Sequence, residues 1–332
     1  MKIGIFINTQ FQPGIPLGPE VSNLLTQVVT ARDSGLDSIW FGQHLVTGPL
    51  QMFQILPLLA RIIPEAKGMT IGSSVVLLSI QNPVQVAEEM ATLDWLSGGN
   101  IVVGTGIGYR AQEFEAAGIP MSIRGKRFEE ALTIVRQCWF EKEVNFSGKY
   151  FNLKHQIPSI KPKQKNGPPI WIAGEVHTAI RRAALMGDAW LPLPVPNRQT
   201  LHKDLAFYRN ERSQAGLIPA IEQPLMREVY VSKNTGNTFN ECQYALKNKY
   251  ETYAKWGQSE SFDSRVSFSS DFRNFSKNRF IIGDKKSVID EIQQYRDELN
   301  IDHLICRVEW PGLEKDKVIQ SIRLLGECSK YL

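Results

Sequence analysis

Apolar residues in this chain gather into short continuous runs, separated by longer segments with helical spacing. Continuous apolar runs, as opposed to alternating ones, are typical of strands buried on both faces of a parallel sheet. The runs with this character lie at 3–7, 38–41, 70–78, 101–103, 170–173, 189–191, 227–231 and 303–308. The pattern therefore predicts a mainly parallel sheet of eight strands.

The intervening segments predict helices, of which the clearest covers 82–96. Asn82 suits the N-cap position, Pro83 suits the first helical position, and apolar residues then recur at helical spacing. Other helices are expected at 20–34, 51–63, 126–139, 178–186, 200–214, 238–256, 286–298 and 314–329. Alternating strands and helices indicate βα units, so we predict an α/β protein with one (β/α)8 TIM barrel domain over 1–332.

Three segments interrupt this alternation, at 105–125, 140–168 and 257–283. Because the active sites of such barrels lie at the carboxyl ends of the strands, we predict that all three are insertions at that face. Serine and phenylalanine residues are interleaved in the third segment, which indicates a mobile lid with an apolar inner side. The alternative for 257–283 is a disordered surface insertion.

Composition narrows the function classes. The chain has 332 residues with a net charge of +4, and the two signs are interspersed without a basic cluster, so we expect no nucleic-acid partner. No apolar run approaches the roughly 18 to 20 residues that a membrane span needs, and the amino terminus becomes polar before a signal-peptide core forms. We therefore expect a cytoplasmic protein that does not bind membranes.

The four cysteines and five histidines are scattered along the chain. They form no Cys-x-x-Cys pair and no His-Glu-x-x-His helix, so we expect no protein-bound metal. We expect the cysteines to fill apolar space in the core.

A glycine-rich segment, Gly104-Thr105-Gly106-Ile107-Gly108, follows the fourth predicted strand. It is not the dinucleotide fingerprint, because the third glycine comes one residue too early. Two interpretations stay open: the backbone approaches a ligand closely, or the glycines allow tight packing of a crossing loop.

The segment from Gly174 to His177 joins another strand to a helix start. Backbone N–H groups at a helix start form an anion site that suits a cofactor phosphate. Glu175 leaves a second interpretation open, because a carboxylate in the first helical turn also suits the helix dipole as a cap.

His44 lies just after the second predicted strand, and so at the chemical face of a barrel. A histidine there can transfer protons near neutral pH, although a loop histidine can also be a bystander. The chain has no Gly-x-Ser-x-Gly elbow, P-loop or kinase motif set. An anion site with few titratable groups favours an enzyme whose cofactor carries the difficult chemistry.

Over its whole length the chain resembles the bacterial luciferase-like monooxygenase family. The matching segments are GLDSIW at 35–40 with His44, IGSSVVLLSIQNPVQVAEEMATLDWLSGGNIVVGTGIGY at 71–109, Glu113 with Phe114, GIP at 118–120, RGKRFEEA at 124–131, PPIWIAGEVHTAIRRAALMGDAW at 168–190, IGD at 282–284 and IDHLICRVEWPG at 301–312. Their shared order and spacing make the resemblance specific.

The resemblance implies a barrel that binds reduced FMN at the strand carboxyl ends, with His44 as the catalytic histidine. It places a non-prolyl cis peptide between Ser74 and Val75, under the flavin ring. The residues it implies at the cofactor phosphate are Gly174, Glu175, Val176 and His177. Further cofactor contacts are expected from Gly104, Thr105, Gly106, Arg110 and Trp190.

Two positions depart from the family pattern. Ile107 stands where the luciferase alpha subunit has a phosphate-binding arginine, so another cation, such as Arg110, Arg124 or Arg181, would be needed. Gln43 stands where relatives often have a glutamate, which removes a negative charge that would favour a protonated His44.

The function implied is a two-component monooxygenase in which reduced FMN and dioxygen oxidise a small, mainly apolar organic substrate. A separate flavin reductase is the expected partner, and the resemblance also implies a homodimer. One alternative is a deazaflavin-dependent oxidoreductase of the same superfamily that transfers hydride. Another is a flavin-binding protein without catalytic activity.

Overall fold

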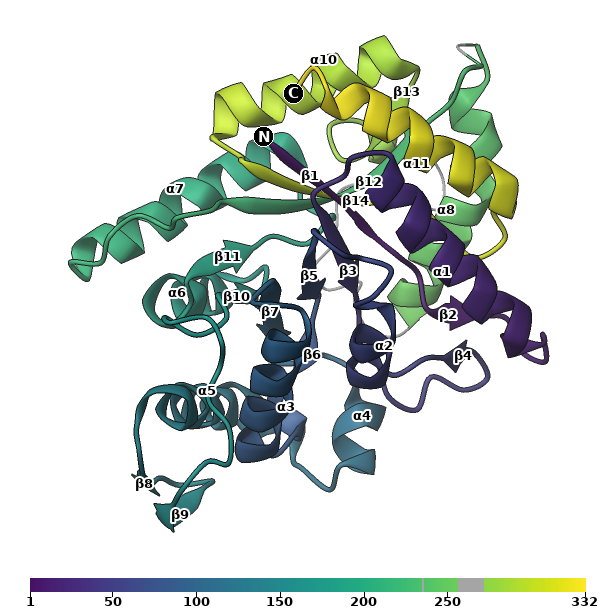
Figure 1. Ribbon diagram of the computed structural model, residues 1–332. Helices are drawn as coiled ribbons and strands as arrows, with labels where there is room; N and C mark the ends of the chain where they lie inside the picture. The colour runs from purple at the N-terminus through teal and green to yellow at the C-terminus, as the bar shows by residue number, and fades with distance from the viewer. Residues whose placement is uncertain (235, 256–271) are drawn as a thin grey trace.

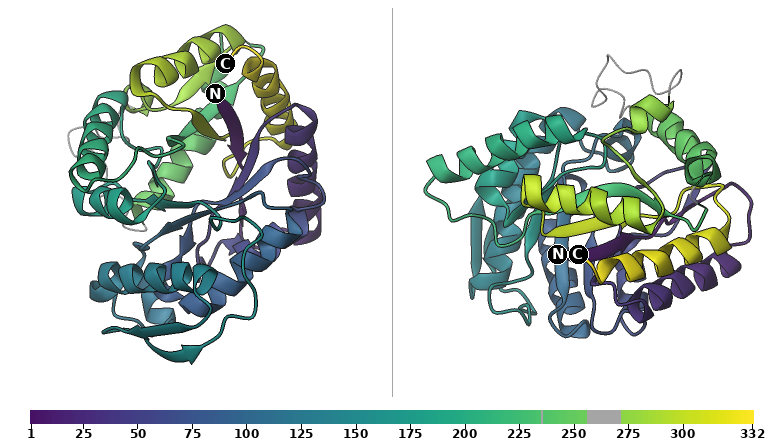
Figure 2. Two further views of the ribbon diagram at one scale, coloured as in Figure 1. Left: turned by 60° about the vertical axis from the view of Figure 1, so that its left-hand side comes forward. Right: turned by 90° about the horizontal axis from the view of Figure 1, so that it is seen from above.

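The computed structural model describes residues 1–234, 236–255 and 272–332. Its centre is a curled sheet wrapped by helices (Figures 1 and 2). The strands follow the order β11, β10, β7, β5, β3, β1, β14, β12, β13, and every described pairing among them is parallel. The predicted α/β class and parallel sheet are therefore confirmed.

Each of the eight apolar runs overlaps a strand of this sheet. These strands are β1 (Lys2–Phe6), β3 (Ser38–Phe41), β5 (Thr70–Ser73), β7 (Ile101–Gly106), β10 (Ile170–Ala173), β11 (Ala189–Leu191), β12 (Pro224–Val231) and β14 (His303–Arg307). Strand β6 (Val76–Leu77) also lies within the run predicted at 70–78. The strands that the sequence did not predict are β13 (Ile281–Gly283) and two antiparallel pairs, β2 (Gln10–Phe11) with β4 (Gln51–Met52) and β8 (Val144–Ser147) with β9 (Asn152–Gln156).

The predicted helices also form, except that residues 51–52 of the helix predicted at 51–63 belong to β4. They are α1 (Leu17–Asp33), α2 (Ile55–Ile62), α3 (Pro83–Leu96), α5 (Arg124–Phe140), α6 (His177–Met186), α7 (Arg198–Gln214), α8 (Thr238–Lys255), α10 (Lys285–Leu299) and α11 (Lys315–Ser329). Shorter helices without a sequence prediction are α4 (Ala111–Ala116), α9 (Phe272–Ser276) and the 3-10 turns η1 (Leu78–Ile80) and η2 (Met121–Ile123).

The start of α3 forms as its sequence indicates. The Asn82 side chain accepts hydrogen bonds from the Val84 and Gln85 amides at 3.0 and 3.3 Å, and Pro83 occupies the first turn. The side-chain oxygen thus satisfies amides that have no carbonyl partner within the helix.

The sheet separates two apolar cores. The outer core lies between strands and helices, and the inner one fills the curl of the sheet. In the inner core the Trp40 and Trp171 rings stack with centroids 4.8 Å apart, and Met226 and Ile305 pack in the same cluster. Side chains along each strand alternate between the two cores, because successive strand residues point to opposite faces.

The two ends of the curl approach each other at β11 and β12. The Met226 amide donates to the Pro192 carbonyl at 3.3 Å, and the Gln223 side chain donates to the Trp190 carbonyl at 3.4 Å. The described residues have no regular ladder between these strands, so a fully closed barrel stays a prediction.

The amino ends of the strands hold a partly buried polar network. His303 Nδ1 lies 3.1 Å from Glu222 Oε2, and its Nε2 lies 2.7 Å from Ser38 Oγ. The Trp40 indole donates to the same Ser38 oxygen at 2.7 Å, and Lys2 pairs with Glu222. This network joins β1 and β14, which also bring the two chain ends together (Figure 1).

The structure places the three predicted insertions at different parts of the molecule. Segment 105–125 connects β7 to α5 through α4, at the strand carboxyl ends, as predicted. The prediction is wrong for 140–168, which follows α5 and precedes β10. Its Lys161 carbonyl accepts from Trp95 at the end of α3, and the Gln164 side chain donates to Ile101, the first residue of β7.

Segment 140–168 thus returns along the outer helices towards the strand amino ends, because helices in βα units run opposite to the strands. In the third segment, residues 257–271 of the predicted lid lie outside the described residues. The remainder contains α9 and β13, and Phe272 and Phe275 of α9 are buried against Tyr250 of α8.

The described part of the chain contains no helix of sufficient length and apolar character to cross a membrane. Within the same residues, no group of three His, Cys, Asp or Glu side chains is placed to hold a metal ion.

Candidate active site

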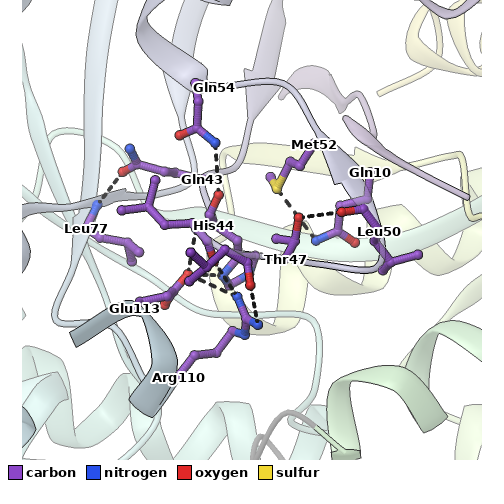
Figure 3. Close-up of polar contacts among 12 residues, drawn as sticks. Gln10, Gln43, His44, Thr47, Leu50, Met52, Gln54, Leu77, Arg110 and Glu113 are labelled. Carbon is purple, nitrogen blue, oxygen red and sulfur yellow. Dashed lines mark hydrogen bonds and ion pairs between the residues drawn. The ribbon is translucent and has the colours of Figure 1, made fainter. Parts of the chain in front are cut away.

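A histidine and a buried glutamate meet at the carboxyl ends of β3 and β7 (Figure 3). His44 Nδ1 lies 2.9 Å from Glu113 Oε1, and the Leu45 amide donates to the same oxygen at 3.0 Å. The Glu113 side chain is fully buried, whereas the His44 side chain is 14% exposed. Glu113 belongs to α4, so the connection between β7 and α5 delivers it to the loop that follows β3.

This contact determines which face of the imidazole can react. A carboxylate accepts hydrogen bonds, so the proton of a neutral His44 resides on Nδ1, and Nε2 is the nitrogen that can exchange a proton with a bound molecule. The negative charge that Gln43 does not supply is supplied here by Glu113.

Arg110 binds the backbone of the loop that carries His44. Its Nη1 donates to the Leu45 carbonyl at 2.8 Å and lies 3.5 Å from Glu113 Oε1, and its Nη2 lies 3.4 Å from the Val46 carbonyl. Val46 has a φ of 46°, which is rare for a β-branched residue. The structure gives Arg110 a positioning role, and its predicted contact with a cofactor stays a prediction.

Gln43 ties the same loop to the neighbouring strand. Its side-chain oxygen accepts from the Leu77 amide and from the Gln81 side chain, both at 3.0 Å. The residue that replaces the family glutamate thus contributes to the placement of its neighbour, His44.

The peptide between Ser74 and Val75 is cis, as the resemblance implied. The Ser74 amide donates to the Phe41 carbonyl at 2.6 Å, while its hydroxyl is buried without a hydrogen-bond partner among the described residues. Glycines flank this peptide on both sides: a Cβ at Gly42 would lie 3.1 Å from the Ser74 carbonyl oxygen, and one at Gly106 would lie 3.1 Å from the Val75 side chain.

The first glycine of the glycine-rich segment has a packing role. A Cβ at Gly104 would lie 1.9 Å from the Ser73 carbonyl oxygen, so β5 and β7 approach too closely for any side chain there. Thr105 is buried, and its hydroxyl donates to the Val76 carbonyl at 3.0 Å. These contacts confirm the packing interpretation at Gly104, and a direct cofactor contact from either residue stays a prediction.

The predicted phosphate segment lies at the surface where α6 begins. Val176 is 62% exposed, and the His177 ring stacks on Phe207 with centroids 4.4 Å apart. Beneath them the fully buried Trp190 donates its indole N–H to the Gly174 carbonyl at 2.8 Å. Trp190 therefore supports this loop from the core, and its own contact with a cofactor stays a prediction.

The three cations considered for the phosphate differ in their surroundings. Arg181 is exposed and pairs with Glu211 at 3.1 Å, whereas Arg110 binds the His44 loop. Arg124 begins α5, and its Nε is buried without a hydrogen-bond partner among the described residues. Helices α5 and α6 are joined by a 3.0 Å contact between Glu129 and Arg182.

A second polar cluster at the carboxyl ends has no sequence prediction. Glu228 of β12 is fully buried and accepts from Trp310 Nε1 at 2.5 Å, from the Tyr250 hydroxyl at 3.3 Å and from Lys249 of α8. Arg307, the last residue of β14, donates to the Tyr253 hydroxyl at 3.3 Å. A charged residue within a mainly apolar strand, as at 228 and 307, is the signal that could have identified this cluster.

Burial and mutual charge control the protonation of this cluster. Burial and then the charge of Arg307 lower the pKa of Lys249 to about 7, against the opposing influence of Glu228. Burial opposes ionisation of Glu228, but Lys249 and Arg307 outweigh it, so the pKa of Glu228 is lowered. The carboxylate is therefore ionised at neutral pH.

Residues 1–300 match the family described as "luciferase-like monooxygenase". The chain belongs to this family. Members of this family are oxidoreductases, and the superfamily uses flavin or deazaflavin cofactors. Membership of the family does not by itself test the alternative of a flavin-binding protein without activity, which stays a prediction.

Two curated proteins illustrate the range of similar sequences. A phthiodiolone/phenolphthiodiolone dimycocerosates ketoreductase of Mycobacterium kansasii is 27% identical over 217 residues, which are 58% of this chain and 59% of that protein. An F420-dependent glucose-6-phosphate dehydrogenase of Kineococcus radiotolerans is 29% identical over 191 residues, 55% of this chain and 53% of that protein. The matches span less than two thirds of either relative.

Among solved structures, the monooxygenase RslO1 from Streptomyces bottropensis has the same fold. It superposes with a TM-score of 0.84 over 98% of each chain, at 21% sequence identity.

Proposed function

We propose that this protein is a monooxygenase that uses reduced FMN and dioxygen to oxidise a small organic substrate at the carboxyl ends of a (β/α)8 barrel. The observation that carries the proposal is the pair of His44 and the fully buried Glu113, which fixes an imidazole at the chemical face. The family description supports the reaction class.

The described residues fit a flavin in two respects. The cis peptide at Ser74 and Val75 lies where the resemblance places the flavin ring, and the buried Ser74 hydroxyl has no hydrogen-bond partner among the described residues, so a bound group could supply one. The start of α6 at His177 provides first-turn amides that suit a phosphate.

Each group then has a defined task. When bound, reduced FMN would supply the electrons and the oxygen chemistry. His44 would exchange a proton with the substrate through Nε2, while Glu113 keeps the other ring nitrogen protonated and Arg110 fixes the loop backbone. Gly174, Glu175, Val176 and His177 would hold the phosphate.

We assign the cation opposite that phosphate to Arg124. Its buried Nε without a partner among the described residues and the contact between α5 and α6 support this choice. In an Arg124→Gln variant we expect FMN affinity to fall about tenfold and riboflavin affinity to stay unchanged. Lys126→Gln, at an exposed position of the same helix, is the matched control and should change neither affinity.

A deazaflavin-dependent oxidoreductase is the second candidate. Two matched relatives are named as a ketoreductase and as an F420-dependent dehydrogenase, and the His44 and Glu113 pair equally suits proton transfer to a carbonyl oxygen. Equilibrium titration of the protein with reduced FMN and with reduced F420 separates the candidates. Tight F420 binding without FMN binding would replace our first choice.

The catalytic assignment has its own test. With reduced FMN, dioxygen and a panel of aldehydes, ketones, sulfides and alkanes, we expect an oxygenated product from the wild-type protein. His44→Ala should lower its formation about 100-fold or more while flavin binding persists. Product formation by His44→Ala at the wild-type rate would contradict the role of His44.

We also propose a homodimer that receives reduced flavin from a separate reductase. Light scattering should give about twice the monomer mass of 37.6 kDa. Oxidation of NADH or NADPH should require an added flavin reductase. A monomer in solution, or NAD(P)H oxidation without the reductase, would contradict the corresponding part.

A further inference from the structure

The neighbouring strands β12 and β14 carry two opposite charges near their carboxyl ends, Glu228 and Arg307. Met226 and Ile305 lie in the inner core, and side chains two residues further along a strand point to the same side. Glu228 and Arg307 occupy those positions and are paired across the two strands. Both side chains therefore enter the interior one layer closer to the carboxyl ends, on the side where His44 lies.

The Arg307 guanidinium contacts an aromatic ring and a tyrosine hydroxyl, and within the described ranges no carboxylate forms a direct ion pair with it. It lies over the Phe6 ring at 4.4 Å and donates from Nη2 to the Tyr253 hydroxyl. Its Nε is buried and has no hydrogen-bond partner in the part of the chain that the structure describes. A buried guanidinium N–H without an acceptor is costly, because the group has left water without a replacement.

The only carboxylate described in this cluster is already engaged. Glu228 accepts from Lys249, Tyr250 and Trp310, so its oxygens are occupied by donors other than Arg307. Among the described residues, two basic side chains thus share one carboxylate inside the protein. An additional anion would balance this excess and supply the acceptor that Arg307 Nε lacks.

Tyr109 connects this cluster to the proton-transfer pair. Its ring meets the His44 ring edge-on with centroids 5.7 Å apart. Burial raises the pKa of Tyr109 well above its ordinary value, Tyr253 and Glu113 add to the increase, and Arg110 and Arg307 oppose it. Tyr109 therefore contacts His44, and the positive charge of Arg307 favours its ionised form.

We propose that Arg307, with Lys249 beside it, binds an anionic group of the substrate, of the carboxylate or sulfonate class, while the carbon to be oxidised faces His44. The proposal rests on the proposed function, because it assumes that His44 marks the reacting position. It makes the substrate amphipathic, with an anionic head and an apolar remainder against Phe6 and the inner core, where the sequence indicated an apolar molecule.

The test compares probes that differ only in their head group. Octane-1-sulfonate, octanoate and octan-1-ol are titrated into the full-length protein by calorimetry, without flavin. We expect the two anions to bind the wild-type protein about tenfold or more tightly than octanol, which is the scale of a charge-assisted hydrogen bond. Arg307→Gln should abolish this preference, and Arg307→Lys should retain part of it.

Arg61→Gln is the matched control, because Arg61 is an exposed arginine paired with Glu65 on the outer helix α2. It should bind all three probes as the wild type does. If Arg307→Gln fails to fold by circular dichroism, Tyr253→Phe takes its place. Loss of the Tyr253 hydroxyl should weaken sulfonate binding severalfold and leave octanol binding unchanged.

Two results would overturn the proposal. One is a wild-type protein that binds octanol as tightly as the anions, or a preference that survives in Arg307→Gln. The other is FMN displacing octane-1-sulfonate, with Arg307→Gln weakening FMN but not riboflavin, because the anion would then be the cofactor phosphate. Flavin titration is measured separately, so absent flavin binding with an intact Arg307-dependent preference would reject only the proposed function.

Discussion

At the scale of single residues, one substitution can remove the negative charge of Glu113 and keep the size and shape of its side chain. Glu113→Gln keeps an oxygen that can accept from His44 Nδ1 but removes the negative charge from a fully buried position. The amide can also rotate and present its NH2 group, which would reverse the imidazole tautomer. We expect kcat on an identified substrate to fall about 10- to 100-fold with little change in KM, as for a residue that positions a general acid–base.

The same variant has a readout that needs no substrate. The chain has only five histidines, so selective ¹⁵N labelling can resolve the His44 imidazole by NMR. In the wild-type protein we expect the shifts of an Nδ1-protonated ring, and in Glu113→Gln a mixture of tautomers. Wild-type shifts together with wild-type kcat in the variant would show that the carboxylate has no positioning role.

At the scale of elements, the approach of β5 to β7 depends on one glycine. An alanine Cβ at position 104 would lie 1.9 Å from the Ser73 carbonyl oxygen, so the strands would have to separate. We expect Gly104→Ala to lower the free energy of unfolding by about 2–3 kcal/mol or more, measured by urea denaturation.

Gly18→Ala is the matched control for this change. Position 18 lies in the first turn of α1 with open space around it, so the same added methyl group should be neutral or stabilise by up to about 1 kcal/mol. Equal effects of the two substitutions would contradict the packing role of Gly104.

The polar network at the strand amino ends, which includes Glu222, His303 and Lys2, should make the free energy of unfolding depend on pH. Hydrogen bonding to His303, and then to Lys2, outweighs burial and lowers the pKa of Glu222 from 4.5 to about 2. A carboxyl group with a lowered pKa in the folded state stabilises the protein above its unfolded value of 4.5. That contribution is lost as the pH falls from about 4.5 towards 2.

We therefore expect Glu222→Gln to lower the free energy of unfolding by about 1–3 kcal/mol at pH 6–7. The difference from wild type should shrink steadily below pH 4.5, in urea titrations at a series of pH values. A difference that is independent of pH would mean that the interaction does not depend on the charge of Glu222.

The elements of this fold were largely predictable, and their contacts were not. Buried parallel strands and capped helices leave local signals, which is why β3, β10 and β11 have the predicted bounds. The short antiparallel pairs and α4 lack such signals. Glu113 could be noted in a motif but not assigned, because its partner His44 is 69 residues away and the contact depends on two connections meeting in space.

The placement of segment 140–168 failed for a related reason. Its length suggested a functional insertion, but its position between a helix and the next strand determines which end of the sheet it reaches. Arg307 and Glu228 were missed because a charge within an apolar strand is informative only when the inward-facing positions are known.

At the scale of the whole molecule, the sheet is unevenly held together. β14 forms a continuous parallel ladder with β1 and another with β12, whereas β11 meets β12 through the Met226 to Pro192 hydrogen bond and the Gln223 side chain. Local opening needs less free energy where fewer backbone hydrogen bonds must break. We therefore expect the curl of the sheet to open first at this seam.

Hydrogen exchange measured by mass spectrometry tests this expectation in the native protein. Backbone amides at 189–191, 193, 225 and 226 should exchange at least about tenfold faster than those of β1 and β14, because an opening that costs about 1.4 kcal/mol less is populated ten times more. If the seam supports the phosphate segment above Trp190, added FMN should slow exchange at 189–193 and leave β1 unchanged. Uniform protection of all strands would indicate a barrel closed as firmly at this seam as elsewhere.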